Sequence, residues 1–569
     1  MLRRALLLTT LLAATAAAQE TGTRELLERY TTDRAVLLRR YDTEWSPERR
    51  ERLRRFYDEW QRQLAAMDFD ALGVEGRIDH VLLANQLRYE LALLDRERGQ
   101  LEEMRGLLPF AEPAMALQQS RRRLEKVDAP DVARRLTGLA AQVDSMRRAV
   151  ERTLRDSSTG TGRPAPIVAF RAMNTLADLR RTLDAWYRYY AGYDPQFTWW
   201  AAEPWKRADS TMSAYHRLLR ERVLGYRAGE DEPIIADPIG SGGLTADLRH
   251  EMLAYSPEEL IRIAEREFAW CEAEMRGAAQ AMGFADWKQA LEKVKNAHVP
   301  PGEQPELARQ LAQEAIEFVE SRRLVTVPAL AREVWRMEMM SPERQRVAPF
   351  FLGGEVLLVA FPTDAMRHEE KLMSLRGNNR HFSRAVVHHE LIPGHHLQGF
   401  MAQRHATHRR PFSTPFLTEG WALWWEMLLW DLDFARSPED RVGMLFWRMH
   451  RAARIIFSLR VHQGQMTPRE AIDFLVERVG HERANATAEV RRSFNGTYPP
   501  LYQVAYMMGG LQLRALHTEL VKGGRMTDRE FHDRILRAGP MPVELIRASL
   551  TGTKLAREHE ARWRFAGEK

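Results

Sequence analysis

Cysteine is almost absent from this chain of 569 residues, in which Cys271 is the single example. One cysteine excludes an intramolecular disulfide and a zinc site built from several thiolates. Long apolar runs are also missing beyond the first twenty residues, so the sequence offers no candidate for a membrane-spanning helix. We therefore expect a fold that depends on its hydrophobic core, without crosslinks and without stable insertion into a membrane.

Charge of one sign is not concentrated anywhere in the sequence. The 84 lysine and arginine residues are interspersed with 78 aspartate and glutamate residues, and the net charge is +6. A nucleic-acid-binding protein needs a basic patch or a recognition motif, and neither is found. The composition, with 44% hydrophobic and 28% charged residues, is that of a globular protein.

The first residues have the pattern of an export signal. Arg3 and Arg4 precede an apolar run from Ala5 to Leu12, and small residues follow as far as Ala18. We predict that residues 1–18 are a signal peptide and that the mature protein is periplasmic or secreted. An uncleaved N-terminal anchor is the alternative. No cysteine follows the apolar run, so a lipid anchor of the bacterial lipoprotein type is not expected.

Apolar residues recur at three- and four-residue spacing through much of the chain, which predicts a mainly α fold. Two segments rich in glycine, proline and serine, 157–166 and 229–243, are the best linkers, and the glycines at 240–243 are expected to form a flexible turn. The run Ser256–Glu259 predicts a capped helix start. Glu355–Phe361 is the best strand candidate, and as an edge strand it could pair with an extended peptide.

The most informative segment, Val386–Phe400, reads VVHHELIPGHHLQGF. The order His-Glu followed by further histidines is that of zinc peptidases, in which histidines bind the metal and the glutamate activates water. In a regular helix, however, His389 and His395 would lie about 9 Å apart along the axis. Pro393 clashes with the carbonyl four residues back, and Gly394 can adopt backbone angles that other residues avoid. A break here could bring His395 beside His389. A histidine cluster on an exposed helix face is the alternative.

A third ligand is expected from the segment LTEGWA, which supplies Glu419, 24 residues after His395. Its surroundings are apolar and aromatic, where a carboxylate is costly unless it is paired or bound to metal. A solvent-facing glutamate is the alternative. Glu426, seven residues further on, is a fallback ligand or a partner of a ligand. His396 and His388 are the remaining alternative ligands, and His396 is the second choice to His395.

The segments VVHHELIPGHHLQ and FLTEGWALWWE resemble the bacterial domain-of-unknown-function 885 family, whose members are regarded as gluzincin-type zinc metallopeptidases. The similarity continues through Arg451–Gly480 and Tyr502–His517. It implies a large multi-helix gluzincin-like fold with a small β-sheet beside the zinc helix, a deep cleft, and one Zn²⁺ per chain. The family usually has an Asp-Thr-Gly-x-His run where this chain has Ser458 to His462, so the histidine is kept but its upstream acid is replaced.

The resemblance also implies roles for individual residues. Glu390 follows the first histidine ligand and is the predicted general base. The tetrahedral intermediate needs a hydrogen-bond donor, for which His462, Tyr502 and Tyr506 are candidates, with His462 slightly favoured. The two tyrosines could instead be core aromatics. Tyr502 and Arg454 are predicted to contact the substrate. Apart from the resemblance, Arg454 or Arg460 could hold a substrate carboxylate, although arginine is common in this chain.

We expect residues 19–235 to form an N-terminal helical region that is one wall of a deep cleft, and residues 236–569 to form a zinc-peptidase-like catalytic region. The predicted function is an exported metallopeptidase that cleaves short peptides. The alternatives are an exported helical peptide-binding protein with a vestigial metal site and a zinc-dependent amidase acting on non-peptide substrates. Exo- or endo-cleavage, side-chain preference and oligomeric state are left open.

Overall fold

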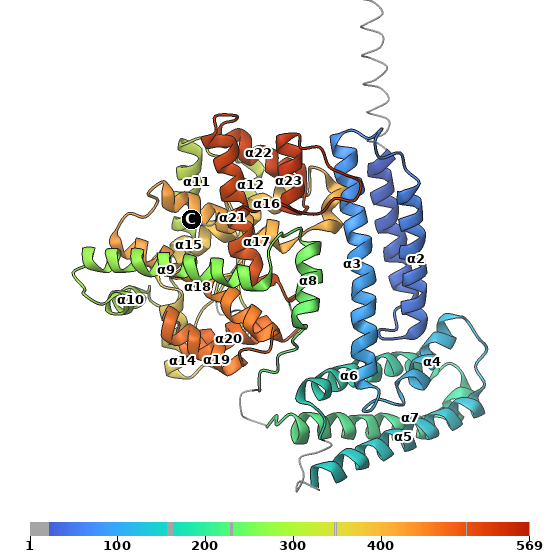
Figure 1. Cartoon of the computed structure of the whole chain (residues 1–569). Coiled ribbons are helices and arrows are strands. Elements are labelled where there is room, and N and C mark those ends of the chain that lie inside the picture. The colour runs from blue at the N-terminus through green and yellow to red at the C-terminus, as the bar shows by residue number, and fades with distance from the viewer. Residues whose placement is uncertain are drawn as a thin grey trace, which may run out of the picture. The chain divides into compact units, whose positions relative to one another are not determined.

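The chain is mainly α-helical in the part that the structure, a computed structural model, describes (Figure 1). The described residues are 22–155, 163–227, 232–345, 348, 350–496 and 498–567. The predicted fold class, mainly α with a small β-sheet, is thereby confirmed. The predicted signal peptide at 1–18 lies outside the described residues, as does most of the predicted linker at 157–166. No described helix is both long enough and apolar enough to cross a membrane.

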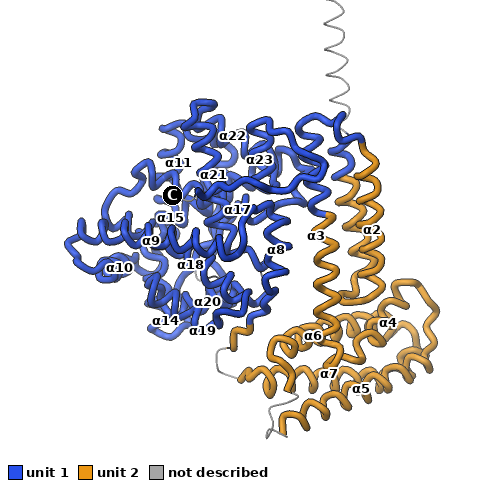
Figure 2. Tube along the Cα trace, in the orientation of Figure 1, with its two compact units in different colours: residues 1–27, 68–86, 236–569 blue, residues 28–67, 87–235 orange. Residues whose placement is uncertain are grey.

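The chain divides into two compact units (Figure 2). Unit 1 comprises residues 1–27, 68–86 and 236–569, and unit 2 comprises residues 28–67 and 87–235. The segment 68–86, although part of the N-terminal region, therefore belongs to unit 1. All candidate site residues fall in unit 1. The role of the N-terminal region as a cleft wall stays a prediction.

Unit 2 is a set of helices around its own apolar core. Its elements are α2 (Pro47–Ala65), most of α3 (Val74–Met104), α4 (Ala111–Arg122), α5 (Ala129–Arg155), α6 (Pro166–Tyr190), α7 (Pro195–Arg217) and the π-helix η1 (Leu218–Val223). Helix α2 shows why they form: Ser46 caps its first turn by accepting from the N–H of Arg49, and proline follows at the first helical position. Its buried face includes Phe56 and Trp60.

The helix over residues 22–40 is divided between the units, with residues 22–27 in unit 1 and 28–40 in unit 2. Unit 1 also contains the helices from α8 onward. They are α8 (Gly240–His250), α9 (Pro257–Ala281), α10 (Trp287–Lys295), α11 (Gln304–Ser321), α12 (Ala329–Val334), α13 (Pro342–Gln345), α14 (His368–Gly377), α15 (Arg380–Glu390), α16 (His395–Ala402), η2 (Thr407–Phe412), α17 (Pro415–Asp431), α18 (Pro438–His462), α19 (Pro468–Phe474), η3 (Leu475–Val479), α20 (Arg483–Phe494), α21 (Tyr502–His517), η4 (Thr518–Lys522), α22 (Asp528–Ala538) and α23 (Val543–Thr551).

Two helix starts test the sequence predictions directly. The predicted cap at Ser256 is present as a full capping box, in which Ser256 and Glu259 satisfy each other's backbone N–H groups. The flexible turn predicted at 240–243 is wrong, because α8 begins at Gly240. Leu244 and Leu248 are buried one helical turn apart, and this apolar face outweighs the low helix propensity of the glycines.

The sheet consists of two parallel strands, β1 (Arg336–Met339) and β2 (Val356–Val359), with Met337 opposite Leu357. Strand β2 lies within the predicted strand Glu355–Phe361, whereas β1 was not predicted because its mostly exposed side chains give no apolar alternation. Leu352 forms an antiparallel bridge with Leu358 on β2. Just beyond it, the N–H of Gly354 donates to the carbonyl of Glu390, 3.2 Å away, which ties the sheet to the end of α15.

Helices α17 and α21 cross at unusually close range. A Cβ added at Gly420 on α17 would lie 2.5 Å from the Cα of Gly509 on α21, and one added at Gly509 would overlap the carbonyl oxygen of Phe416. Only glycine permits two helix backbones to approach this closely. Helix α17 is buried on all sides, as its tryptophans and leucines require. The crossing brings Glu419 of α17 next to the tyrosines at the start of α21.

Candidate metal centre

The segment between α15 and α16 breaks the helix inside the histidine motif. Asn379 caps α15 by accepting from two backbone N–H groups, and the helix ends at Glu390. After four intervening residues, α16 begins at His395. The break is held by the N–H of Gly394, which donates to the carbonyl of His388 at 3.0 Å, and by Trp421, whose indole N–H donates to the carbonyl of Pro393 at 2.9 Å. The predicted interruption is therefore present.

Gly394 allows the chain to fold back on α15. A Cβ at this position would lie far inside 3.0 Å of the carbonyl oxygen of His389, so no other residue fits without a shift of backbone. Its φ of −77° is an ordinary value, and the reason for glycine is thus close approach rather than a left-handed conformation. The break places the rings of His389 and His395 4.8 Å apart, as the sequence predicted.

His389 is held on both of its ring nitrogens. Nδ1 lies 2.6 Å from Oε1 of Glu426, and Nε2 lies 3.6 Å from Oε2 of Glu419. Glu426 is in turn 3.4 Å from the guanidinium of Arg451. A carboxylate on Nδ1 sets the orientation and tautomer of the ring, which leaves Nε2 as the nitrogen presented to the cavity. Glu426 thus lies on the Nδ1 side of His389, as the partner of a predicted ligand.

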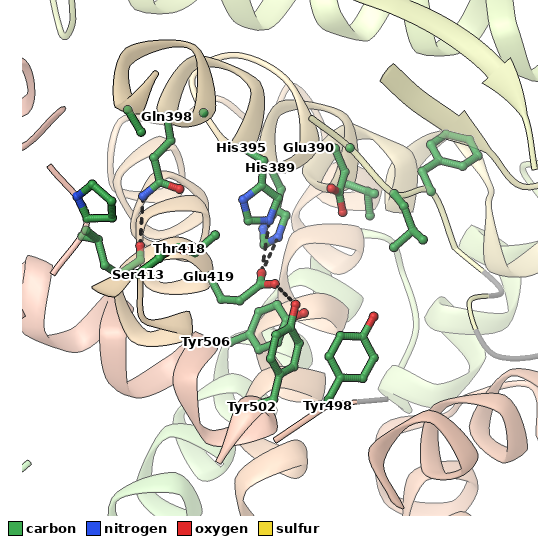
Figure 3. A pocket seen from close by; sticks show the side chains of 18 of the residues that line it. His389, Glu390, His395, Gln398, Ser413, Thr418, Glu419, Tyr498, Tyr502 and Tyr506 are labelled. Carbon is green, nitrogen blue, oxygen red and sulfur yellow. Dashed lines mark hydrogen bonds and ion pairs between the residues drawn. The ribbon is translucent and has the colours of Figure 1, made fainter. Parts of the chain in front are cut away.

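Glu419 joins the two histidines. Its Oε2 lies 3.1 Å from Nε2 of His395, and its Oε1 accepts a hydrogen bond from the hydroxyl of Tyr502. Glu390 belongs to the same cluster. One ring nitrogen each of His389 and His395 and one carboxylate oxygen of Glu390 lie within 4.8 Å of one another. Figure 3 shows Glu419 close to the nitrogens of both rings and Glu390 beside them, facing the same space.

The electrostatics of the cluster favour a positive charge between the side chains. Burial alone would lower the pKa of His389, but its hydrogen bonds with Glu419 and Glu426 outweigh burial and raise the pKa to about 9. Burial would likewise raise the pKa of Glu419, yet the charges and hydrogen bonds of His395 and His389 hold it well below the usual range. Two imidazoles and a buried carboxylate are a donor set that suits Zn²⁺, so these residues fit a bound metal ion.

The other two histidines of the motif point elsewhere. Nε2 of His396 lies 2.7 Å from the carbonyl oxygen of Ala331 on α12, away from Glu419. His388 is fully buried, with its ring 5.7 Å from that of Phe434, and burial lowers its pKa to about 3. Of these histidines, His395 lies beside Glu419, whereas His396 faces α12 and His388 is in the core.

Of the three predicted donors, two lie at the site. Tyr502 and Tyr506 line the cavity, and the ring of Tyr506 stacks on that of His389 at 6.1 Å. His462 is a correction to the prediction, because it is buried against Phe494 and is not among the described residues that line the cavity. It stands eight residues beyond Arg454 on α18, or about 12 Å along the helix axis.

The cluster opens into a cavity of about 570 Å³, a size typical of small-ligand sites. The segment 350–353, rather than β2, forms part of its wall, so β2 is not placed to pair with a peptide there. Sequence reasoning missed Arg451, Arg492 and Tyr498, which also line the cavity. The spacing of Arg451 and Arg454 on one face of α18 was the available signal, but in an arginine-rich chain it does not stand out.

These features describe a mainly helical protein with a buried His-Glu cluster at the wall of a cavity. The chain belongs to the family described as bacterial protein of unknown function (DUF885), which matches residues 32–550. Among curated proteins, none matches it.

Two solved structures share the fold. One, from Shewanella oneidensis, is described as "a putative lipoprotein of unknown function"; it is 16% identical, with a TM-score of 0.68 over 93% of this chain and 99% of that one. The other, from Colwellia psychrerythraea, is described as a "putative lipoprotein" and is also 16% identical, with a TM-score of 0.60 over 94% and 99% of the two chains. At this identity the likeness extends to the fold alone.

Proposed function

We propose that the chain is an exported zinc-dependent metallopeptidase that hydrolyses short peptides. The observation that carries this proposal is the convergence of His389, His395 and Glu419 from three helices, with Glu390 facing the same space. A zinc ion held by these three side chains would supply Lewis acidity, which lowers the pKa of water and polarises a peptide carbonyl.

The remaining steps fall to side chains of the protein. Glu390 would accept the proton of the attacking water and pass it to the leaving amine. The hydroxyl of Tyr502 is engaged by Glu419, so we assign the stabilisation of the oxyanion to Tyr506 and a contact with the substrate to Tyr502. Arg454 is assigned to a substrate carboxylate.

Export is part of the proposal. It is supported by the signal pattern at residues 1–18 and by the description of both structural neighbours as lipoproteins. Short peptides are proposed as substrates because the cavity has the size of a small-ligand site.

A peptide-binding protein with a vestigial metal site is the main alternative. Such a protein would need the ligands but not a base, and the position of Glu390 beside both histidines therefore favours an enzyme. A zinc-dependent amidase would use the same residues, and a substrate screen separates it from a peptidase.

The proposal is tested by metal analysis of the purified protein together with mass-spectrometric cleavage of a peptide library. We expect about one zinc per chain and hydrolysis of short peptides, with stably folded proteins left intact. The Glu390→Gln variant should keep its zinc and its fold but lose peptide hydrolysis by at least roughly 100-fold, the typical contribution of a general base. A protein without zinc, or a Gln variant with full activity, would contradict the assignment.

A further inference from the structure

Three arginines line the cavity beside the metal centre. Arg451 and Arg454 come from α18 and Arg492 comes from α20, and their side chains are almost completely buried. Their ion pairs are with Glu426 and Glu489, not with the predicted ligand Glu419. Buried guanidinium groups need negative charge and hydrogen-bond acceptors nearby, because they have lost the water that would otherwise stabilise them.

The acceptors provided by the described residues do not balance this cluster. Arg454 forms a bidentate pair with Glu489 at 2.7 and 2.9 Å, and Arg492 shares the same carboxylate at 3.8 Å. Arg451 contacts Glu426 at 3.4 Å, but that carboxylate also serves His389. Three cations thus share two carboxylates, one of which already serves a histidine.

Neighbouring groups do not change this balance. His450 lies 3.9 Å from Glu489, and burial together with the nearby arginines holds its pKa well below the usual range, so it is neutral. One buried nitrogen on each guanidinium, on Arg451, Arg454 and Arg492, also lacks a hydrogen-bond partner. The cluster, which lines the cavity, is therefore short of both negative charge and acceptors among the described residues.

The cluster lies within reach of the metal centre. Tyr506 stands between them, with its ring 6.1 Å from that of His389 and 4.7 and 4.4 Å from the guanidinium carbons of Arg451 and Arg454. The guanidinium carbons of Arg451 and Arg454 are therefore within about 11 Å of the His389 ring, a distance that about three residues of an extended peptide cover at roughly 3.5 Å each. On the same side, Arg492 lies over the ring of Tyr498, which Figure 3 shows beside Tyr502.

We propose that Arg451, Arg454 and Arg492 bind the C-terminal carboxylate of a short peptide, so that cleavage removes up to about three residues from that end. Arginine suits this task because its planar fork of donors matches a carboxylate. The ligand would supply the negative charge and the acceptors that the cluster lacks. This inference rests on the proposed peptidase function, and it names the class of substrate for the same cavity.

The test compares binding of three versions of one tetrapeptide to the Glu390→Gln variant, which cannot complete hydrolysis. The versions end in glycine as a free acid, in glycine amide, and in glutamate amide. Isothermal titration should show the free acid binding at least about tenfold more tightly than either amide, since a hydrogen-bonded charge pair contributes on this scale. Equal binding of acid and amide, or no binding of the acid, would overturn the proposal. Tight binding of the glutamate amide would overturn the assignment to the C-terminus.

Variants connect the preference to the cluster. Arg492→Met should remove the preference for the free acid while zinc content stays unchanged, and Arg492→Lys should restore part of it. The control is Arg460→Met, which alters an arginine on the same helix as Arg454 that pairs with Glu265 outside the cavity. If Arg492→Met does not fold, the comparison of acid and amide in the Glu390→Gln protein still shows whether the cavity recognises a C-terminal carboxylate.

Peptide cleavage by the wild-type protein is a separate readout. Cleavage of acid and amide at the same rate would overturn the carboxylate site while the peptidase function stands. A preference for binding the free acid without any cleavage would refute the peptidase function and keep the carboxylate site.

Discussion

Replacing Gly394 by alanine tests whether the break between α15 and α16 builds the metal centre. The new Cβ would lie far inside 3.0 Å of the carbonyl oxygen of His389, and both atoms belong to backbone or are fixed to it. An ordinary carbon–oxygen contact requires a displacement of about 1 Å or more. Metal–ligand distances tolerate about 0.2 Å, so a shift of this size moves His395 out of reach of an ion held by His389 and Glu419. We expect zinc affinity to fall by at least about 100-fold, or roughly 2.7 kcal/mol.

The assay is competition for zinc with a chromophoric chelator, with circular dichroism to establish that the variant is folded. Gly399→Ala is the matched control, because it adds the same methyl group one turn later on α16, where no atom lies within 4 Å of the new Cβ. It should bind zinc as the parent does. A Gly394→Ala protein with unchanged affinity would show that the close approach to His389 is not what positions His395.

Three further predictions concern the carboxylate that orients His389, the choice between two histidines, and a buried acid at the end of α8. Glu426→Gln should weaken zinc binding by about 10- to 100-fold, because the carboxylate on Nδ1 of its histidine partner is lost while both ligand nitrogens remain; unchanged affinity would contradict the orienting role. His395→Ala should abolish stoichiometric zinc, whereas His396→Ala should keep it, as elemental analysis will show. Burial raises the pKa of Glu251 from 4.5 to about 8, although the hydrogen bond that it accepts from Thr414 lowers the pKa. Between these pH values the folded state therefore holds a proton that the unfolded state releases. Stability should therefore fall as pH rises from about 4.5 to about 8, by up to roughly 5 kcal/mol, and Glu251→Gln should unfold at a higher temperature than the parent at pH 8.5 but not at pH 4.

The sequence predicted the local parts of the site better than its surroundings. His389, Pro393, Gly394 and His395 lie within seven residues, so helix geometry and the steric properties of proline were enough to predict a break. Glu419 was predictable because a carboxylate in a run of tryptophans needs a partner. These inferences depend only on the backbone geometry and the side-chain chemistry of residues close together in the sequence.

The sequence did not predict the arginine cluster, nor which of the three candidate hydrogen-bond donors to the tetrahedral intermediate lie at the cavity. Both depend on contacts between residues that are far apart in the sequence. Arg454 on α18 and Arg492 on α20 share Glu489, which also lies on α20, and no local pattern in the sequence records the pairing of Arg454 with Glu489. His462 was favoured because it lies in a block that matches the family, but the length of α18 carries it away from the cavity. Strand β1 was missed since its side chains are mostly exposed and give no alternating pattern.

The burial of α17 has a consequence for the order in which the protein matures. Glu419 reaches the histidines only when α17 is enclosed by its neighbours, and the crossing at Gly420 and Gly509 leaves no room for a loosely docked helix. An unfolded or partly assembled chain therefore lacks a complete set of ligands, and zinc would act as a selective ligand of the native state. At a free concentration one hundred times its dissociation constant, such a ligand adds about 2.7 kcal/mol to the free energy of unfolding. Under the proposed function, zinc supply would thus affect the lifetime of the protein as well as its activity.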